Sequence, residues 1–258
     1  MSELNKRIIT AIVLLLAVYG WYAHVSSPWF ERGLALIGFV ASCELVLLIK
    51  LRQPVLYMTA VLVVWAAFTR WPGIELLLLG SFVWFALFVF GARREVASFG
   101  DFFAAIWIFG WLFVFALAIL QTHASATGRG FIIGACLAVW VSDSAAYFVG
   151  RAIGKHRLCP AISPGKSVQG AIGGLLFGVP VAVGCWLYWG VMPLVAAIML
   201  AIVTVLAGML GDLSESAVKR LVGAKDSGRW LPGHGGILDR IDAIIMAVPV
   251  SWILWRML

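Results

Sequence analysis

The sequence predicts an all-α, polytopic membrane protein of about nine transmembrane helices with large polar loops on the cytoplasmic side. Two observations predict this class. Hydrophobic residues make up 63% of the chain and charged residues only 12%, and the mean hydropathy is +1.02. Soluble domains contain roughly 45–50% apolar and about 25% charged residues. The 13 Trp and 16 Phe residues suit membrane interfaces and lipid-facing surface.

A helix needs about 20 mostly apolar residues to cross the hydrocarbon core of a bilayer. The first such run follows Lys6 and Arg7, as in a signal peptide, but lacks a clean small-x-small cleavage site. We therefore expect it to remain as the first helix. The expected spans are 8–24, 30–49, 55–70, 73–91, 102–121, 130–150, 168–189, 191–211 and 241–257.

The basic residues predict the orientation. Of the 19 Lys and Arg residues, only Arg32, Arg70, Arg129 and Arg256 fall on the side opposite the N-terminus. Cytoplasmic loops carry the excess of Lys and Arg, so we expect the N-terminus and the long polar segments in the cytoplasm. Orientation explains the net charge of +7, and no nucleic-acid partner is expected.

The chain is expected to form a single integral membrane domain over residues 1–258. Within it, we expect an N-terminal helical part at about 1–125 and a second helical part at about 126–258, which holds both long polar segments, 151–167 and 212–240. The four cysteines form no C-x-x-C pair. We therefore expect neither disulfides nor a zinc site.

Glu44 and Asp143 lie well inside predicted spans, where ionisable groups are costly and often functional. For Glu44, a functional role and a structural hydrogen bond between helices both remain open. For Asp143 a functional role is favoured over a structural one, because its helix leads directly into the basic segment 151–167.

That segment contains Arg151, Lys155, Arg157 and Lys166, enough cations to bind a polyanion; contact with anionic lipid is the alternative. A P-loop is rejected because proline occupies position 160 and no strand is expected before Lys166. Beyond this segment, glycine recurs every four residues at positions 170, 174 and 178, which predicts close helix packing.

The second polar segment is rich in carboxylates. Asp212, Glu215 and Lys219 have i, i+3 and i, i+4 spacing, which alone is typical of a solvated helix end with a salt pair. Asp239 and Asp242 share one helix face. Carboxylate oxygens are ligands that magnesium prefers, so Asp212, Asp239 and Asp242 are candidate metal ligands. Metal and cations together favour phosphoryl or nucleotidyl transfer.

The run SAVKRLVGAKDSGRWLPGHGGILDRID at 216–242 resembles the signature of the phosphatidate cytidylyltransferases. The pattern is S-x-hydrophobe-K-R, four residues, K-D, a short spacer and P-G-H-G-G-x-x-D-R-x-D. The run SDSAAYFVGRAIGKHRLCPAISPGKS at 142–167 is similar to a second block of that family, and GDLSES at 211–216 precedes the signature as expected.

The resemblance implies a bacterial inner-membrane enzyme that converts CTP and phosphatidic acid to CDP-diacylglycerol and pyrophosphate. It implies Mg²⁺, with a second cation as an option, and a homodimer as one arrangement. The implied catalytic residues are Asp212, Lys225, Asp226, Asp239 and Asp242, of which the three at 212, 239 and 242 bind metal. The implied substrate-binding residues are Asp143, Arg151, Ser163, Lys166, Ser216, Lys219, Arg220, His234 and Arg240.

The second block departs from the family pattern at two positions. Gly165 replaces a lysine, and Gln169 replaces a glutamate near the start of the following helix. Two enzymatic alternatives remain open, a CTP-dependent polyprenol or phytol kinase and a cytidylyltransferase for another lipid phosphate. The alternative from another class is a membrane transporter in which Glu44 and Asp143 line an ion path.

Overall fold

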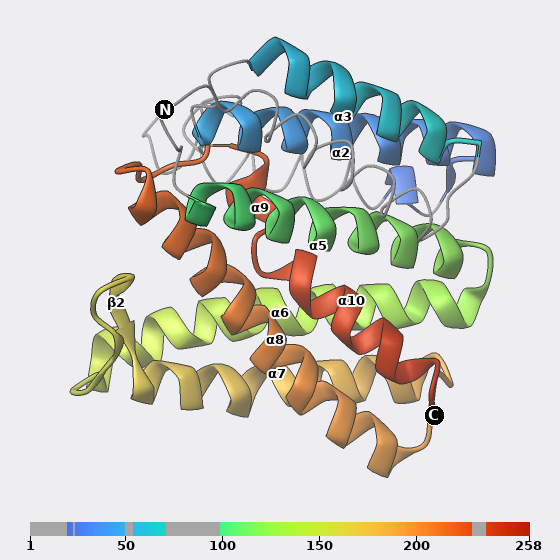
Figure 1. Ribbon diagram of the computed structural model, residues 1–258. Coiled ribbons are helices and arrows are strands. Elements are labelled where there is room, and N and C mark those ends of the chain that lie inside the picture. Colours follow the sequence, from blue (N-terminus) through green and yellow to red (C-terminus); the bar gives the residue numbers. More distant parts are fainter. Residues whose placement is uncertain (1–19, 23, 50–53, 71–98, 229–235) are drawn as a thin grey trace, which may run out of the picture.

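The computed structural model describes residues 20–22, 24–49, 54–70, 99–228 and 236–258 (Figure 1). The described part is almost wholly helical, in agreement with the predicted all-α class. Its helices are α2 (Ser27–Leu48), α3 (Pro54–Phe68), α5 (Phe99–His123), α6 (Ala126–Ile153), α7 (Val168–Tyr188), α8 (Leu194–Leu221), α9 (Leu238–Ile241) and α10 (Ile244–Trp255).

Among the described residues, α6, α7 and α8 are long and apolar enough to cross a membrane. Shorter apolar helices lie at Tyr57–Phe68, Trp107–His123 and Ile244–Trp255. The chain is therefore a membrane protein by the length and composition of its helices. The span predicted at 73–91 lies outside the described residues, as does the predicted span 8–24 apart from residues 20–22 and 24.

Three local predictions differ from the structure. Strands β1 (Arg157–Cys159) and β2 (Ser163–Ser167) pair antiparallel, although no strand was expected before Lys166. Helix α8 continues ten residues beyond the predicted end of its span, because the i, i+4 pair of Glu215 and Lys219 supports another two turns of helix. The last predicted span is divided into α9 and α10.

Helices α6 and α7 run side by side, with the β-hairpin at the end where α6 leads into α7 (Figure 1). Glycines make this close approach possible. A Cβ atom at Gly170 would lie 2.6 Å from the carbonyl oxygen of Ala146, and one at Gly178 would lie 2.8 Å from that of Ala138. The predicted packing role of the glycine repeat is confirmed.

The N-terminal helices pack through aromatic side chains. Trp65 on α3 contacts Phe68 and Phe113, and its Nε1 donates to Ser42 Oγ on α2 at 3.0 Å. Helix α10 then contacts both α5 and α8. The N-terminal helices are thereby joined to the polar end of α8.

The glycine packing predicts opposite effects for two matched substitutions on α7. Gly178→Ala is expected to destabilise the protein by about 1–3 kcal/mol, since the methyl group meets backbone that cannot move aside. Gly184→Ala has nothing within 4 Å of the new Cβ, and is expected to be neutral or stabilising by up to ~1 kcal/mol through helix propensity. Thermal unfolding in detergent measures both. Equal melting temperatures would contradict the packing role.

Candidate active site

The polar residues gather where the C-terminal end of α8 meets α9, the β-hairpin and the end of α6. Gly211 on α8 allows the closest of these approaches. A Cβ atom there would lie 2.5 Å from the carbonyl oxygen of Asp242 and 3.0 Å from that of Ala243. The backbone after α9 therefore passes directly against α8, next to Asp212.

Lys219 is shared between two carboxylates. Its Nζ donates to Glu215 Oε2 at 2.7 Å and to Asp239 Oδ1 at 2.8 Å. All three side chains are nearly buried, with 1% exposure for Glu215, 12% for Lys219 and 8% for Asp239. Buried charges of this kind require both pairing and hydrogen bonds. The salt pair predicted on α8 is confirmed, but the expectation that it is solvated was wrong.

Asp239 also binds the backbone on both sides of the segment 228–235. Its two oxygens accept from the amide of Ser227 at 3.1 and 3.0 Å, and Oδ2 accepts from the amide of Gly236 at 2.9 Å. Burial raises the pKa of this carboxyl, but the hydrogen bonds from Lys219, Gly236 and Ser227 outweigh it and lower the pKa below its usual value. Asp239 is therefore ionised at neutral pH.

A second lysine binds the other end of this acidic group. Lys166 Nζ on β2 lies 2.5 Å from Asp212 Oδ2 on α8, and Ser216 Oγ donates to Asp212 Oδ1 at 3.3 Å. The next residue after Lys166, Ser167, caps α7 by accepting from the amide of Gly170 at 3.1 Å. The start of α7 thus positions Lys166 against α8.

Two further aspartates lie near this pair. Asp242, at the end of α9, accepts from the amide of Ala243 at 2.8 Å and lies in the electrostatic field of Asp212. Asp143, on α6, interacts electrostatically with Asp212, Asp242 and Lys166. The structure thus brings together three sequence-predicted aspartates and one sequence-predicted lysine.

The hairpin is tied to its surroundings by two polar contacts. Arg220 Nε donates to the carbonyl oxygen of Ile162 at 3.3 Å. Gln169 Oε1 accepts from the amides of Lys155 and His156 at 3.1 and 3.2 Å. The neutral amide at 169 therefore holds the loop after α6 although it lacks the charge of the glutamate expected there.

Other predicted residues lie around this group. Arg151 is exposed on α6 and bonds Tyr147, and Ser163 begins β2. Lys225, Asp226 and Arg240 are exposed. His234 lies outside the described residues.

Two buried glutamates, Glu44 and Glu215, were not predicted to belong to the site, but the structure places both in it. Glu215 Oε1 is buried without a hydrogen-bond partner among the residues that the structure describes. Glu44 on α2 is 1% exposed, and its carboxylate accepts from the amides of Ile237 and Leu238. The signal for Glu44 was its charge within an apolar span; its partners could not be read from the sequence.

The donor chemistry of this acidic group suits magnesium, because carboxylate oxygens are its preferred protein ligands. Glu215 Oε1 has no hydrogen-bond partner among the described residues, and burial together with Asp242 raises the pKa of this carboxyl well above its usual value, so either a proton or a cation satisfies it. Within the described ranges, however, no three His, Cys, Asp or Glu side chains surround a common point. The oxygens of Asp239 already accept hydrogen bonds from Lys219 and two amides.

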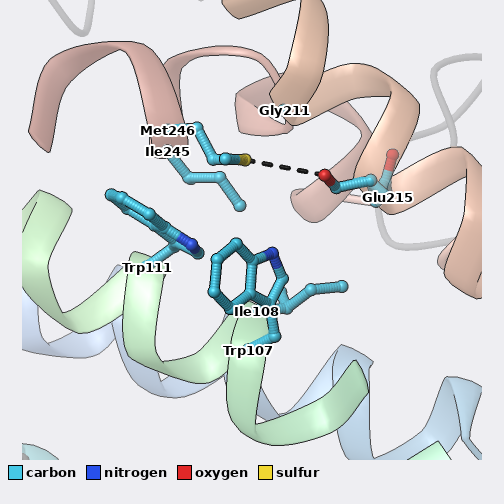
Figure 2. Close-up of a pocket in the computed structure, with 8 residues that line it drawn as sticks. Trp107, Ile108, Trp111, Gly211, Glu215, Ile245 and Met246 are labelled. Atoms are coloured by element: carbon cyan, nitrogen blue, oxygen red, sulfur yellow. Dashed lines mark hydrogen bonds between the residues drawn. The ribbon is translucent and has the colours of Figure 1, made fainter. Parts of the chain in front are cut away.

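A small pocket lies beside the polar group, between α5, α8 and α10 (Figure 2). Trp107 and Trp111 from α5 face Ile245 and Met246 from α10, and Glu215 closes the side toward α8. Trp107 is half-exposed. Glu215 therefore borders this apolar pocket and also accepts a hydrogen bond from Lys219.

Comparison with known proteins identifies the family. The sequence matches the cytidylyltransferase family over residues 5–258. It is 31% identical over 278 residues to the phosphatidate cytidylyltransferase of Haemophilus influenzae, covering 95% of this chain and 96% of that protein. The phosphatidate cytidylyltransferases of Staphylococcus saprophyticus and Staphylococcus aureus (strain COL) are 45% and 47% identical over 129 and 131 residues, or 49% of each chain. The chain belongs to the cytidylyltransferase family.

Proposed function

We propose that this protein is a phosphatidate cytidylyltransferase, which converts CTP and phosphatidic acid to CDP-diacylglycerol and pyrophosphate. A phosphate oxygen of phosphatidic acid forms a bond to the α-phosphorus of CTP, and the bond between that phosphorus and the β-phosphate oxygen breaks. Pyrophosphate leaves with the bonding electrons. The names of relatives that match nearly the whole chain support this reaction.

The observation that carries the proposal is the position of Lys166 and Lys219 within one acidic group at a helix end. Phosphoryl-type transfer needs fixed positive charge against the phosphate oxygens and reactants held in line. Lys166, on a hairpin whose outer residues are exposed, is suited to contact the CTP phosphates. Lys219 donates to Glu215 and Asp239 and acts by fixing Asp239. Exposed Arg151, Lys225 and Arg240 supply further positive charge.

The lipid substrate requires an apolar surface next to this polar group. Trp107, Trp111 and Met246 line a small apolar pocket beside Glu215, and we expect the lipid phosphate to approach the site from this side. The acyl chains can then remain in apolar surroundings while the phosphate reaches Asp212 and Lys166. A transporter is less well supported, because Glu44 is bound to backbone amides and Asp143 lies near Lys166.

Magnesium is part of the proposal, with Asp212, Asp239 and Asp242 as the residues that hold it and Glu215 beside them. When bound, it neutralises charge on the CTP phosphate oxygens. Asp239 and Asp212 each contact a lysine through one oxygen, whereas the hydrogen bond from the amide of Ala243 to Asp242 occupies only Oδ1, so Asp242 is the most available of the three ligands. A second cation and a homodimer remain part of the proposal.

We place the protein in the bacterial inner membrane, with the N-terminus, the β-hairpin and the end of α8 in the cytoplasm. The distribution of Lys and Arg supports this orientation. CTP is soluble, so a site at the cytoplasmic surface gives it access without crossing the bilayer.

The reaction predicts that pyrophosphate release from CTP requires phosphatidic acid and Mg²⁺ together. Purified protein in detergent is expected to release it only when both are present, as measured by a coupled pyrophosphate assay. Polyprenol, phytol and other lipid phosphates serve as comparison acceptors. Turnover of one of these in place of phosphatidic acid would assign a different substrate, and no turnover with any acceptor would refute the proposed reaction.

Removing one carboxylate charge from the site is expected to abolish turnover. Asp242→Asn should lower kcat about 100-fold or more, because a neutral amide neither balances the cations nor binds metal as strongly. Glu31→Gln makes the same chemical change on α2 outside the site and is the matched control. Size-exclusion chromatography confirms folding. Near-normal turnover of folded Asp242→Asn protein would remove Asp242 from the site.

The orientation predicts opposite labelling of two introduced cysteines in a background without native cysteine. Lys225→Cys, after α8, should react with a membrane-impermeant maleimide only in inverted vesicles. Tyr188→Cys, at the exposed end of α7, should react only in right-side-out vesicles. The reverse pattern would place the site outside the cytoplasm.

A further inference from the structure

Glu44, from the N-terminal half of the chain, hydrogen-bonds the backbone of the signature segment. Glu44 Oε1 accepts from the amide of Ile237 at 2.9 Å, and Oε2 accepts from the amide of Leu238 at 2.9 Å. Ser227 Oγ also donates to Oε2, at 3.4 Å. The side chain is 1% exposed, so these bonds provide the polar contacts that a buried carboxylate needs.

These contacts supply α9 with its N-terminal cap. The first amides of a helix have no acceptor within the helix, and the residue at the N-cap position, Ile237, makes no side-chain cap. Glu44 accepts from the first amides instead, from a helix more than 190 residues earlier in the chain. Helix α9 is only four residues long and carries Asp239, with Asp242 directly after it. The place of both aspartates therefore depends on α2.

Glu44 and Asp239 together bind Ser227 and the three residues 236–238. Before residue 228, the amide of Ser227 donates to Asp239 and its hydroxyl donates to Glu44. After residue 235, the amide of Gly236 bonds Asp239 and the next two amides bond Glu44. Gly236 leaves no room between them: a Cβ atom there would lie 2.6 Å from Glu44 Oε2 and would collide with Ser227 Oγ.

We propose that Glu44 is a positioning residue for the reaction, which acts by holding the start of α9 and so sets Asp239 and Asp242 against α8. Its contacts are with the backbone and Ser227, and it acts on substrate only through α9. The activity readout of this inference rests on the proposed function. The structural contact itself does not.

Glu44→Gln tests the role, because the amide keeps the size of the side chain but replaces one acceptor with a donor that faces a backbone N–H. We expect kcat to fall about 10- to 100-fold, as for residues that orient a catalytic group. KM for CTP should change less than about threefold, since the hairpin contacts do not involve Glu44. In hydrogen exchange, the amides of Ile237 and Leu238 should exchange faster.

Ser42→Ala is the matched control. Ser42 is equally buried on the same helix, and its hydroxyl bonds Trp65 and the carbonyl oxygen of Gly38, away from α9. It should lower thermal stability while leaving kcat and the exchange of Ile237 and Leu238 unchanged. Equal losses of kcat in both variants would show general packing and overturn the positioning role, as would wild-type kcat in Glu44→Gln.

Gly236→Ala tests the same contact from its other side if Glu44→Gln does not fold. Its methyl group displaces the Glu44 carboxylate, so kcat should again fall with little change in KM for CTP. Wild-type kcat in this variant would overturn the inference. If the wild-type protein is inactive with phosphatidic acid and CTP, the proposed function is refuted, but the structural role of Glu44 is still open to test. Amide exchange at Ile237 and Leu238 then decides the role of Glu44.

Discussion

The ammonium group of Lys219 lies between the buried carboxyl groups of Glu215 and Asp239, and this arrangement joins α8 to α9. Burial and the neighbouring Asp242 raise the pKa of the Glu215 carboxyl to about 9, so this group carries a proton at neutral pH. The charge of Lys219 is then balanced by the ionised Asp239, which also accepts from the amides of Ser227 and Gly236. These hydrogen bonds meet the needs of a nearly buried charge pair.

Two residues outside the signature segment, Glu44 and Lys166, belong to the site. Glu44 comes from the N-terminal part, and Lys166 comes from a hairpin between two long helices. The division that the sequence predicted near residue 125 is crossed by the contacts of α5 with α6 and α10 and by the hydrogen bonds of Glu44 to the start of α9. Among the described residues of the signature segment, those at the start of α9 bind Glu44 on α2, and Asp239 binds Lys219 on α8.

The sequence predicted the helical class, the glycine packing of α7 and the chemistry of the polar segments, because these depend on composition and local spacing. It could not show that Glu215 is buried, since an i, i+4 pair has the same spacing on a solvated helix as on a buried one. The hairpin was missed because Pro160, Pro164 and Gly165 are poor strand residues; its register depends on contacts with α6 and α7. The partners of Glu44 arise only from tertiary packing.

The distance along the chain between Glu44 and its partners has a consequence for biosynthesis. The carboxylate is made 193 residues before the amide of Ile237. At ribosomal rates of about 5–20 residues per second, that interval lasts roughly 10–40 s. An unpaired carboxyl group within an apolar helix is costly in lipid. The hydrogen bonds of Glu44 can form only after residues 236–238 have been made, so a helix near the start of the described fold completes its polar contacts only when synthesis is nearly finished.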